Sequence, residues 1–273
     1  IITEKGKEVI NKVSAFFMRR RNWTIPYALF LAVFVVMPLL LIVLYAFTDA
    51  EGAFTFANFR KFMMHPEALN TFVYSIGIAI ITTLACLLLG YPAAYILSQA
   101  RFNTSRTMVV LFILPMWVNI LIRTLATVAL FDFLDLPLGE GALIFGMVYN
   151  FLPFMVLPIY NVLIKIDNNV INAARDLGAN SVQTFCKVIF PLSIPGVISG
   201  ITMVFVPALT TFVISDLLGG GKILLIGNVI EQSFKQNSNW HVGSGLSLVL
   251  MVFIIASMAM VAKYDKEEGG SAF

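Results

Sequence analysis

The sequence predicts an all-α membrane protein with six transmembrane helices. Hydrophobic residues make up 59% of the chain and charged residues only 12%, and the mean hydropathy is +0.89, values outside the range of ordinary soluble domains. Several almost uncharged stretches are long enough to cross the ~30 Å hydrocarbon core, which needs ~20 helical residues. The chain lacks the ~10-residue alternation of barrel strands, so these spans must be helices that satisfy their own backbone.

The spans are expected in one transmembrane domain, residues 22–262, at 22–48, 70–99, 107–131, 141–164, 193–215 and 243–262. The first is too long for a removable signal peptide and lacks its cleavage-site flank, so we expect it to be retained. Residues 1–21 are predicted to form a cytoplasmic amphipathic arm, and residues 263–273 a cytoplasmic tail. The apolar stretch 217–234 is too short to cross, so it is predicted to be an outer re-entrant or interfacial helix.

The distribution of Lys and Arg predicts the orientation of the spans. With the N-terminus in the cytoplasm, thirteen of the 18 basic residues fall on the cytoplasmic side and one falls within a span. The four on the outer side are Arg60, Lys61, Lys222 and Lys235. An excess of Lys and Arg is typical of cytoplasmic loops. Both termini and the connecting segment 165–192 are therefore predicted to be cytoplasmic.

No recognisable catalytic or metal-binding constellation is present in the sequence. The two histidines, His65 and His241, and the two cysteines, Cys86 and Cys186, fall in separate segments. The chain contains no HExxH, no CxxC pair, no Walker loop and no GxSxG elbow. We therefore expect no catalytic residues, no metal site and no cofactor in this chain, and no enzymatic activity of its own.

The polar connection between the fourth and fifth spans, which reads NAARDLGANSVQTFCKVIFPLSIPG, carries the strongest functional signal. Small Ala173 and Ala174 on a short helix would let a groove of another protein approach closely. Gly178 would permit a sharp turn after that helix, and Pro191 and Pro195 would restart the chain toward the next span. The pattern is that of a docking element for a partner.

This connection resembles the EAA signature, E-A-A-x3-G-x9-I-x-L-P, of permease subunits in bacterial ABC importers. Asn172 stands in place of the Glu, Val188 in place of the Ile and Phe190 in place of the Leu. In that family the short helix sits in a cleft of a cytoplasmic ATPase. Docking by shape should survive here, whereas Asn172 lacks a charge for pairing with the ATPase. The resemblance implies ATPase-coupling roles for Asn172, Ala173, Ala174, Arg175, Asp176, Gly178 and Pro191.

The resemblance extends over nearly the whole chain. The blocks LLLGYPAAYILS, LPMWVNILIRTLA, YNFLPFMVLPIY, AARDLGA and SDLLGGGKILLIGNVI look most like the spermidine/putrescine group of these permeases. This resemblance implies a type I, MetI-like fold in the bacterial cytoplasmic membrane, with the chain forming half of a heterodimeric pore. The implied partners are a second permease, an ATPase dimer that uses ATP and Mg, an external substrate-binding protein, a polyamine and membrane lipid, with no nucleic acid.

Within the membrane domain, Asp216 is the best candidate for meeting a polyamine. It ends the fifth predicted span beside a glycine-rich bend, and carboxylates and aromatic faces suit polyammonium ions. Trp117, Asn119 and Tyr149 are further candidates for the pathway. Asn119 is four residues before Arg123, so the two are expected to share one helix face.

Arg123 is the one charge inside a predicted span. A charge there costs ~2.5–3.5 kcal/mol on insertion scales, so it should face the bundle interior and have a partner. We favour a structural ion pair, with Asp216 or with an acid on the partner subunit, because a cation in the pathway would repel a polyamine. The alternative is that Arg123 lines the pathway.

Two other functions are compatible with the sequence. One is a permease of a related ABC importer for another small solute, which the connection would suit equally well. The other is a six-span channel or an intramembrane enzyme. Against the latter stand the missing catalytic constellation and the lack of a TVGYG-like filter or a charged ring.

Overall fold

The computed structural model describes residues 24–49, 51–64, 66–99, 107–235 and 240–269. In these residues it contains helices and turns, a single isolated bridge between Thr48 and Phe54, and no strand. Five helices are long and apolar enough to cross a membrane, or six if one bent pair is counted as a span. The prediction of an all-α membrane protein is confirmed, and the predicted arm 1–21 lies outside the described residues.

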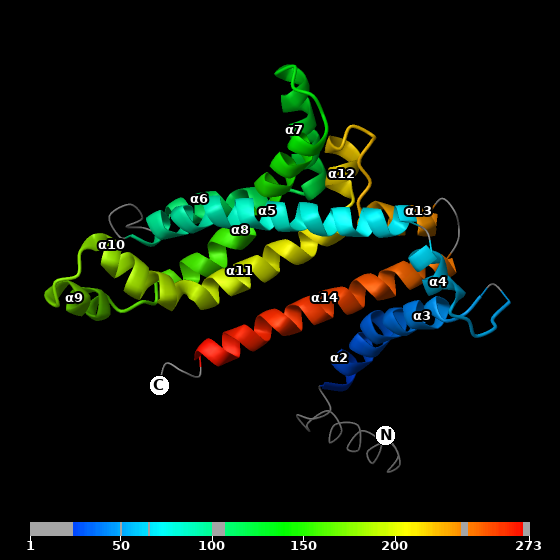
Figure 1. The fold of residues 1–273 in the computed structure, drawn as a ribbon, viewed down its shortest axis with the longest axis horizontal. Coiled ribbons are helices and arrows are strands. Elements are labelled where there is room, and N and C mark those ends of the chain that lie inside the picture. The colour runs from blue at the N-terminus through cyan, green and yellow to red at the C-terminus, as the bar shows by residue number, and fades with distance from the viewer. Residues whose placement is uncertain (1–23, 50, 65, 100–106, 236–239, 270–273) are drawn as a thin grey trace, which may run out of the picture.

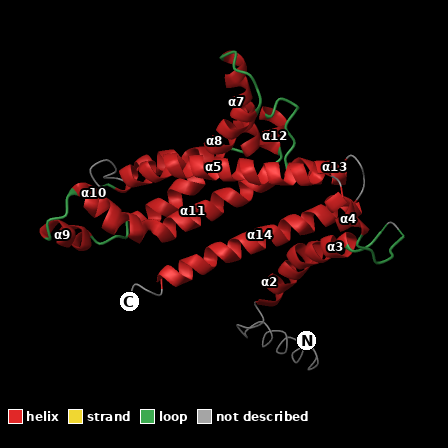
Figure 2. Cartoon of the chain, in the orientation of Figure 1, coloured by secondary structure: helices red, strands yellow, loops and turns green. Residues whose placement is uncertain are grey.

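Three long helices form the centre of the molecule and pack against one another (Figure 1). They are α5 (Pro66–Ser98), α8 (Glu140–Leu163) and α11 (Phe190–Thr210). Helix α14 (Trp240–Gly269) runs beside them and packs against α3 (Met37–Ala46) and α13 (Ile226–Lys235). The remaining helices are short: α2 (Thr24–Leu31), α4 (Ala57–Met64), α6 (Thr107–Ile113), α7 (Ile120–Phe133), α9 (Asn168–Asp176), α10 (Ser181–Thr184) and α12 (Val213–Leu218). Figure 2 shows the described connections between helices as loops.

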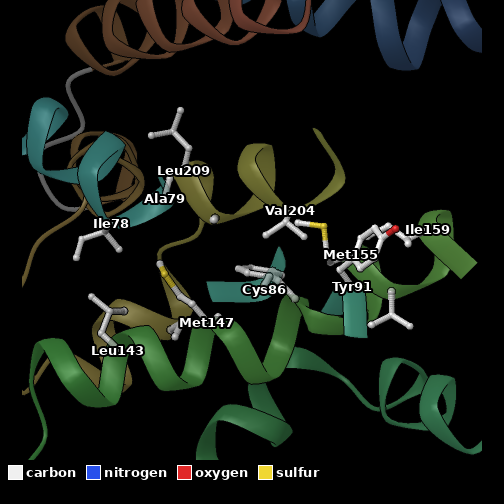
Figure 3. Packing of buried hydrophobic residues seen from close by; sticks show 14 of the residues in the cluster. Ile78, Ala79, Cys86, Tyr91, Leu143, Met147, Met155, Ile159, Val204 and Leu209 are labelled. Carbon is white, nitrogen blue, oxygen red and sulfur yellow. The ribbon is translucent and has the colours of Figure 1, made fainter. Parts of the chain in front are cut away.

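The buried core lies between α5, α8 and α11. Met155 and Ile159 of α8 and Val204 of α11 are fully buried there (Figure 3). Gly196 and Gly200 let the two helices approach closely, because a Cβ atom at Gly196 would lie 3.0 Å from the Cα atom of Ile159 and one at Gly200 would lie 3.1 Å from the Met155 carbonyl oxygen. Small residues four apart commonly set such close helix contacts in membranes.

The third predicted span is not one straight helix. Helix α6 passes through a 3₁₀ turn, Leu114–Trp117, and α7 then leaves at an angle of 93°. Pro115 in that turn cannot donate a backbone hydrogen bond, and Val118 after it is extended. Helix α7 therefore stands away from the three central helices (Figure 1). The predicted third span, 107–131, is thus divided into two helices at this turn.

Two π turns occur directly ahead of prolines, at Ala32–Val36 and at Phe185–Ile189. In each case the residue before Pro38 or Pro191 donates its N–H to the carbonyl five residues earlier. A proline has no N–H and its ring crowds the carbonyl four residues back, so a locally wider turn relieves the conflict. The helix therefore continues through the proline in both places.

This continuation changes the expected role of two prolines. The apolar helix that contains the fifth span begins at Ser181 and runs to Thr210. Pro191 and Pro195 lie inside it. The sequence suggested that these prolines restart the chain toward the next span. They do not, because the π turn lets the helix continue through Pro191.

Candidate functional site

The connection between α8 and α11 is a helical elbow, residues 165–192, at the end of the molecule away from α13 (Figure 1). Helix α9 begins after Asp167, whose carboxylate accepts a hydrogen bond of 2.9 Å from the Asn169 N–H. Such a cap satisfies one of the free donors at a helix start. The start of α9 is thus set by a residue of the elbow itself.

Helix α9 ends in a Schellman motif centred on Gly178. The Gly178 N–H donates to the Arg175 carbonyl at 2.8 Å, and the Ala179 N–H donates to the Ala174 carbonyl at 3.0 Å. Gly178 has φ = +85°, the left-handed conformation that this motif requires and that glycine adopts without strain. The predicted sharp turn at Gly178 is confirmed.

Helix α10 begins with a capping box. The Gln183 N–H donates to Asn180 Oδ1 at 2.8 Å, and the Asn180 N–H donates to Gln183 Oε1 at 3.0 Å. This reciprocal pair satisfies two backbone donors at once. Each bend of the elbow is therefore closed by hydrogen bonds between residues at most five positions apart.

The outer surface of the elbow carries small and apolar side chains. Four residues of the expected coupling helix are exposed and one is half-buried; the exposed ones are Asn172, Ala173, Arg175 and Asp176, and the half-buried one is Ala174. Leu177 is 90% exposed and Val182 is 70% exposed. Two such apolar side chains beside a short alanine face form a surface suited to a protein groove. Pro191 lies exposed within α11.

A second polar cluster surrounds Asn228, which is fully buried on α13. Its Oδ1 atom accepts hydrogen bonds from Ser215 Oγ at 2.6 Å and from the Leu225 N–H at 2.9 Å. Its Nδ2 atom donates to the Phe212 carbonyl at 3.2 Å and to Asp216 Oδ1. The amide thus uses its full hydrogen-bonding capacity. Sequence reasoning missed Asn228, although it stands in the same SDLLGGGKILLIGNVI block as Asp216.

The charge environment of Asp216 involves α13 as well as α12. Partial burial raises the pKa of Asp216, while the hydrogen bond from Asn228 opposes that rise and nearby Glu231 adds to it. Glu231 forms an ion pair with Lys235, with 2.7 Å between Oε1 and Nζ. Both line a largely apolar cleft of about 490 Å³ against α14, together with Phe212 and other residues. Carboxylates beside apolar walls can hold alkylammonium groups.

Arg123 lies in a different environment. It is 7% exposed, and its Nε and Nη1 atoms have no hydrogen-bond partner within the described chain. It lines a pocket of about 230 Å³ with Tyr149 of α8. Among the described residues the structure contains no ion pair between Arg123 and Asp216, one of the two partners suggested by the sequence, because the Asp216 carboxylate bonds to Asn228 instead.

The candidate pathway residues have different local partners. Tyr149 lies beside Arg123, whereas Asp216 belongs to the Asn228 cluster. Trp117 is 84% exposed in the 3₁₀ turn. Asn119 caps α7 by accepting a 2.8 Å hydrogen bond from the Leu121 N–H. It therefore sits at the start of α7 rather than on a face within a longer helix.

Comparison with curated proteins shows similarity along most of the chain. It is 38% identical to the spermidine/putrescine transport system permease protein PotB of Escherichia coli K12, over 81% of this chain and 89% of that protein. It is 36% identical to the protein of the same name from Haemophilus influenzae, over 81% and 85%. A PotB homolog of Mycoplasma genitalium is 29% identical, over 78% and 80%.

Solved structures share the fold at low sequence identity. A bacterial ABC transporter involved in the import of the acidic polysaccharide alginate matches 94% of this chain and 99% of its own, with a TM-score of 0.67 and 13% identity. The inward-facing MetNI methionine ABC transporter matches 74% and 94%, with a TM-score of 0.55 and 16% identity. Residues 87–266 match the family described as binding-protein-dependent transport system inner membrane component. The chain therefore belongs to this family of inner-membrane transport components.

Proposed function

We propose that this chain is a permease subunit of an ATP-driven polyamine importer for spermidine or putrescine. The observation that supports the substrate class is the 38% identity to a spermidine/putrescine permease over most of both chains. In this proposal the chain forms half of the translocation pathway. A PotC-type permease supplies the other half, a PotA-type ATPase dimer supplies energy, and a PotD-type external protein delivers the solute.

The elbow would be the contact with the ATPase. Its exposed alanines and the apolar side chains of Leu177 and Val182 offer a surface that a groove can cover, and covering them removes apolar area from water. Asn172 in place of the motif Glu leaves this docking to rest on shape. Both termini and the elbow would then lie in the cytoplasm, in agreement with the Lys and Arg distribution.

The proposed mechanism is alternating access. A loaded binding protein docks on the outer side, ATP and Mg close the ATPase dimer, and the elbow carries that motion into the helices. Hydrolysis, which takes place in the partner chain, returns the pathway to the inward-open form. Asp216, with Trp117, Asn119 and Tyr149 as lesser candidates, would meet the passing polyamine, whereas selectivity would rest mainly in the binding protein.

The test is the ATPase activity of the assembled complex in lipid nanodiscs with its binding protein. Spermidine and putrescine should stimulate hydrolysis, and sulfate should not. Ala173→Glu places a buried charge at the docking surface, so stimulation should be lost although the complex still assembles. Ala173→Ser keeps the small size and should retain stimulation. An active complex that ignores polyamines would refute the substrate and favour an importer permease for another small solute.

A further inference from the structure

Helix α7 carries a cation whose acceptor is missing from the described chain. Arg123 is 7% exposed, and two of its three guanidinium nitrogens, Nε and Nη1, make no hydrogen bond there. A buried charge without a partner is strongly unfavourable, and buried guanidinium groups in proteins are normally paired. The described residues therefore leave the acceptor for this side chain to come from elsewhere.

Three acids on neighbouring elements already have other partners. Asp216 accepts a hydrogen bond from Asn228, Glu140 accepts one from the Tyr74 hydroxyl at 2.6 Å, and Glu231 pairs with Lys235. Asp132 lies on α7 itself, but nine residues further on, which is ~13 Å along a helix.

A pocket stands open beside the guanidinium. Its volume is about 230 Å³, several times the ~30 Å³ that one water molecule occupies in the liquid. Thr127 and Tyr149 line it with Arg123, and apolar side chains form the remaining wall. Tyr149 is 43% exposed, so its side chain is accessible from outside. A carboxylate entering this pocket would lie beside the guanidinium and could accept a charge-assisted hydrogen bond from it.

The position of Tyr149 along α8 gives the depth of the pocket. Helix α8 has 24 residues, or ~36 Å at 1.5 Å per residue, and Tyr149 lies nine residues, ~13 Å, from its first residue. For a ~30 Å hydrocarbon core centred on this helix, the pocket lies ~10 Å below the headgroup boundary. Lipid phosphates do not normally reach that depth, whereas a carboxylate on a protein helix can be held there.

The surface around the pocket is apolar and exposed in this chain. Helix α7 stands away from the central helices at 93° to α6 (Figure 1). Its side chains Ile122, Leu125 and Phe133 are 60%, 47% and 84% exposed. A projecting apolar helix with one buried, unpaired cation has the features of half an interface: apolar area for burial and a charge for register.

We propose that α7 docks against the second permease subunit and that the Arg123–Tyr149 pocket receives a carboxylate side chain from it. The inference rests on the proposed function, since it takes the second permease as the partner. It assigns Arg123 to the subunit contact and not to the polyamine pathway. The pair would fix which permease assembles with this chain, because a partner without the acid leaves the guanidinium buried and unpaired.

The first experiment measures subunit association and the stability of the lone chain in parallel. Arg123→Met keeps the length of the side chain and removes its charge. Association with the second permease should weaken about 30-fold or more, the effect of truncating one partner of a buried charge pair. The lone chain should unfold at the same or a higher temperature, because an unpaired buried charge has been removed. This opposite response separates loss of pairing from misfolding. Lys222→Met, which removes an exposed cation outside α7, should change neither quantity.

The second experiment locates the acid. Arg123→Glu should abolish association, and one Asp→Lys or Glu→Lys substitution within the membrane segments of the partner should restore it. Leu130 lines the pocket and is 47% exposed. A Leu130→Cys variant in a Cys186→Ser background, which removes the one exposed cysteine, should form a disulfide with a cysteine placed beside that same acid.

Each other outcome overturns the inference in a recognisable way. If Arg123→Met associates normally, the pocket is not part of the contact, although the proposed function stands. If the loss occurs in nanodiscs with phosphatidylglycerol but not in phosphatidylcholine alone, the pocket takes an anionic lipid headgroup. If the wild-type chain associates with no second permease, the proposed function fails as well. If it associates but its complex ignores polyamines, only the proposed substrate fails.

Discussion

Asn228 binds Asp216 across the glycine-rich bend, so a fully buried amide on α13 fixes a carboxylate at the surface of α12. The same amide also holds Ser215 and the backbone of Leu225. Asn228 is therefore a positioning residue for Asp216 and a structural tie between the two short helices.

Replacing Asn228 with Leu should destabilise the protein by about 3 kcal/mol, because it leaves several buried donors and acceptors unpaired. Thermal unfolding in detergent would show the loss, and the polyamine-stimulated ATPase activity should fall with it. Asn161→Leu changes an exposed asparagine on α8 and should have little effect. Equal unfolding temperatures for the two variants would contradict the role of Asn228.

Asp216 should give the protein a characteristic pH dependence. Partial burial raises its pKa above the ordinary value of 3.8, so between that value and the raised one the folded state binds more protons than the unfolded state. The stability then falls as pH rises through this window and is greatest below it. Asp216→Asn should remove this slope from thermal unfolding measured between pH 3.5 and pH 7. A slope that persists in the variant would assign it to another group.

Gly178→Ala should weaken the transmission through the elbow. No atom lies within 4 Å of the added Cβ, so the effect comes from the positive φ, which costs an alanine about 1 kcal/mol. Polyamine-stimulated ATPase activity should decrease while assembly is retained. Gly141→Ala is the matched control, since it also meets open space but lies in regular helix, where alanine is favoured. Full activity of Gly178→Ala would show that the turn tolerates another geometry.

Gly196→Ala should disturb the packing of α11 against α8. The new Cβ would lie 3.0 Å from the Cα atom of Ile159 and from the carbonyl oxygen of Pro158, and backbone atoms cannot swing aside. A loss of about 1–3 kcal/mol is expected from such overpacking, visible as a lower yield of monodisperse protein in fluorescence-detected size-exclusion chromatography. Gly77→Ala, which meets no atom within 4 Å, should keep the wild-type yield.

The sequence predicted the features that depend on local chemistry. Long apolar stretches had to become helices, and Gly178 had to turn the chain, because each outcome follows from a few adjacent residues. The comparisons confirmed the predicted family. The 93° bend after Pro115 was not predicted, since a proline within a span is compatible with anything from a slight kink to a break.

Features that join distant residues were missed or misassigned. Asp216 and Arg123 suggested an ion pair because they are opposite charges in one membrane domain. In the structure Asp216 instead accepts a hydrogen bond from Asn228, an uncharged residue twelve positions later. Arg123 lines a separate pocket. An amide in an apolar stretch gives no sign of which group it will bind until the bend between the helices is known.

The local bonding of the elbow has a mechanical consequence. The Asp167 cap, the Schellman motif and the Asn180 capping box each close within a few residues. The bends of the elbow are therefore held by their own hydrogen bonds, and Ile166, Ile171 and Phe185 pack it against the core. A force applied to α9 would then turn it as a stiff lever. The lever can bend at its two ends, which are the short link after α8 and the π turn Phe185–Ile189. The hydrogen-bonded ring of a π turn is wider than that of an α-helix, so this turn can change its bonding by one residue. The torque would pass through this turn directly into α11.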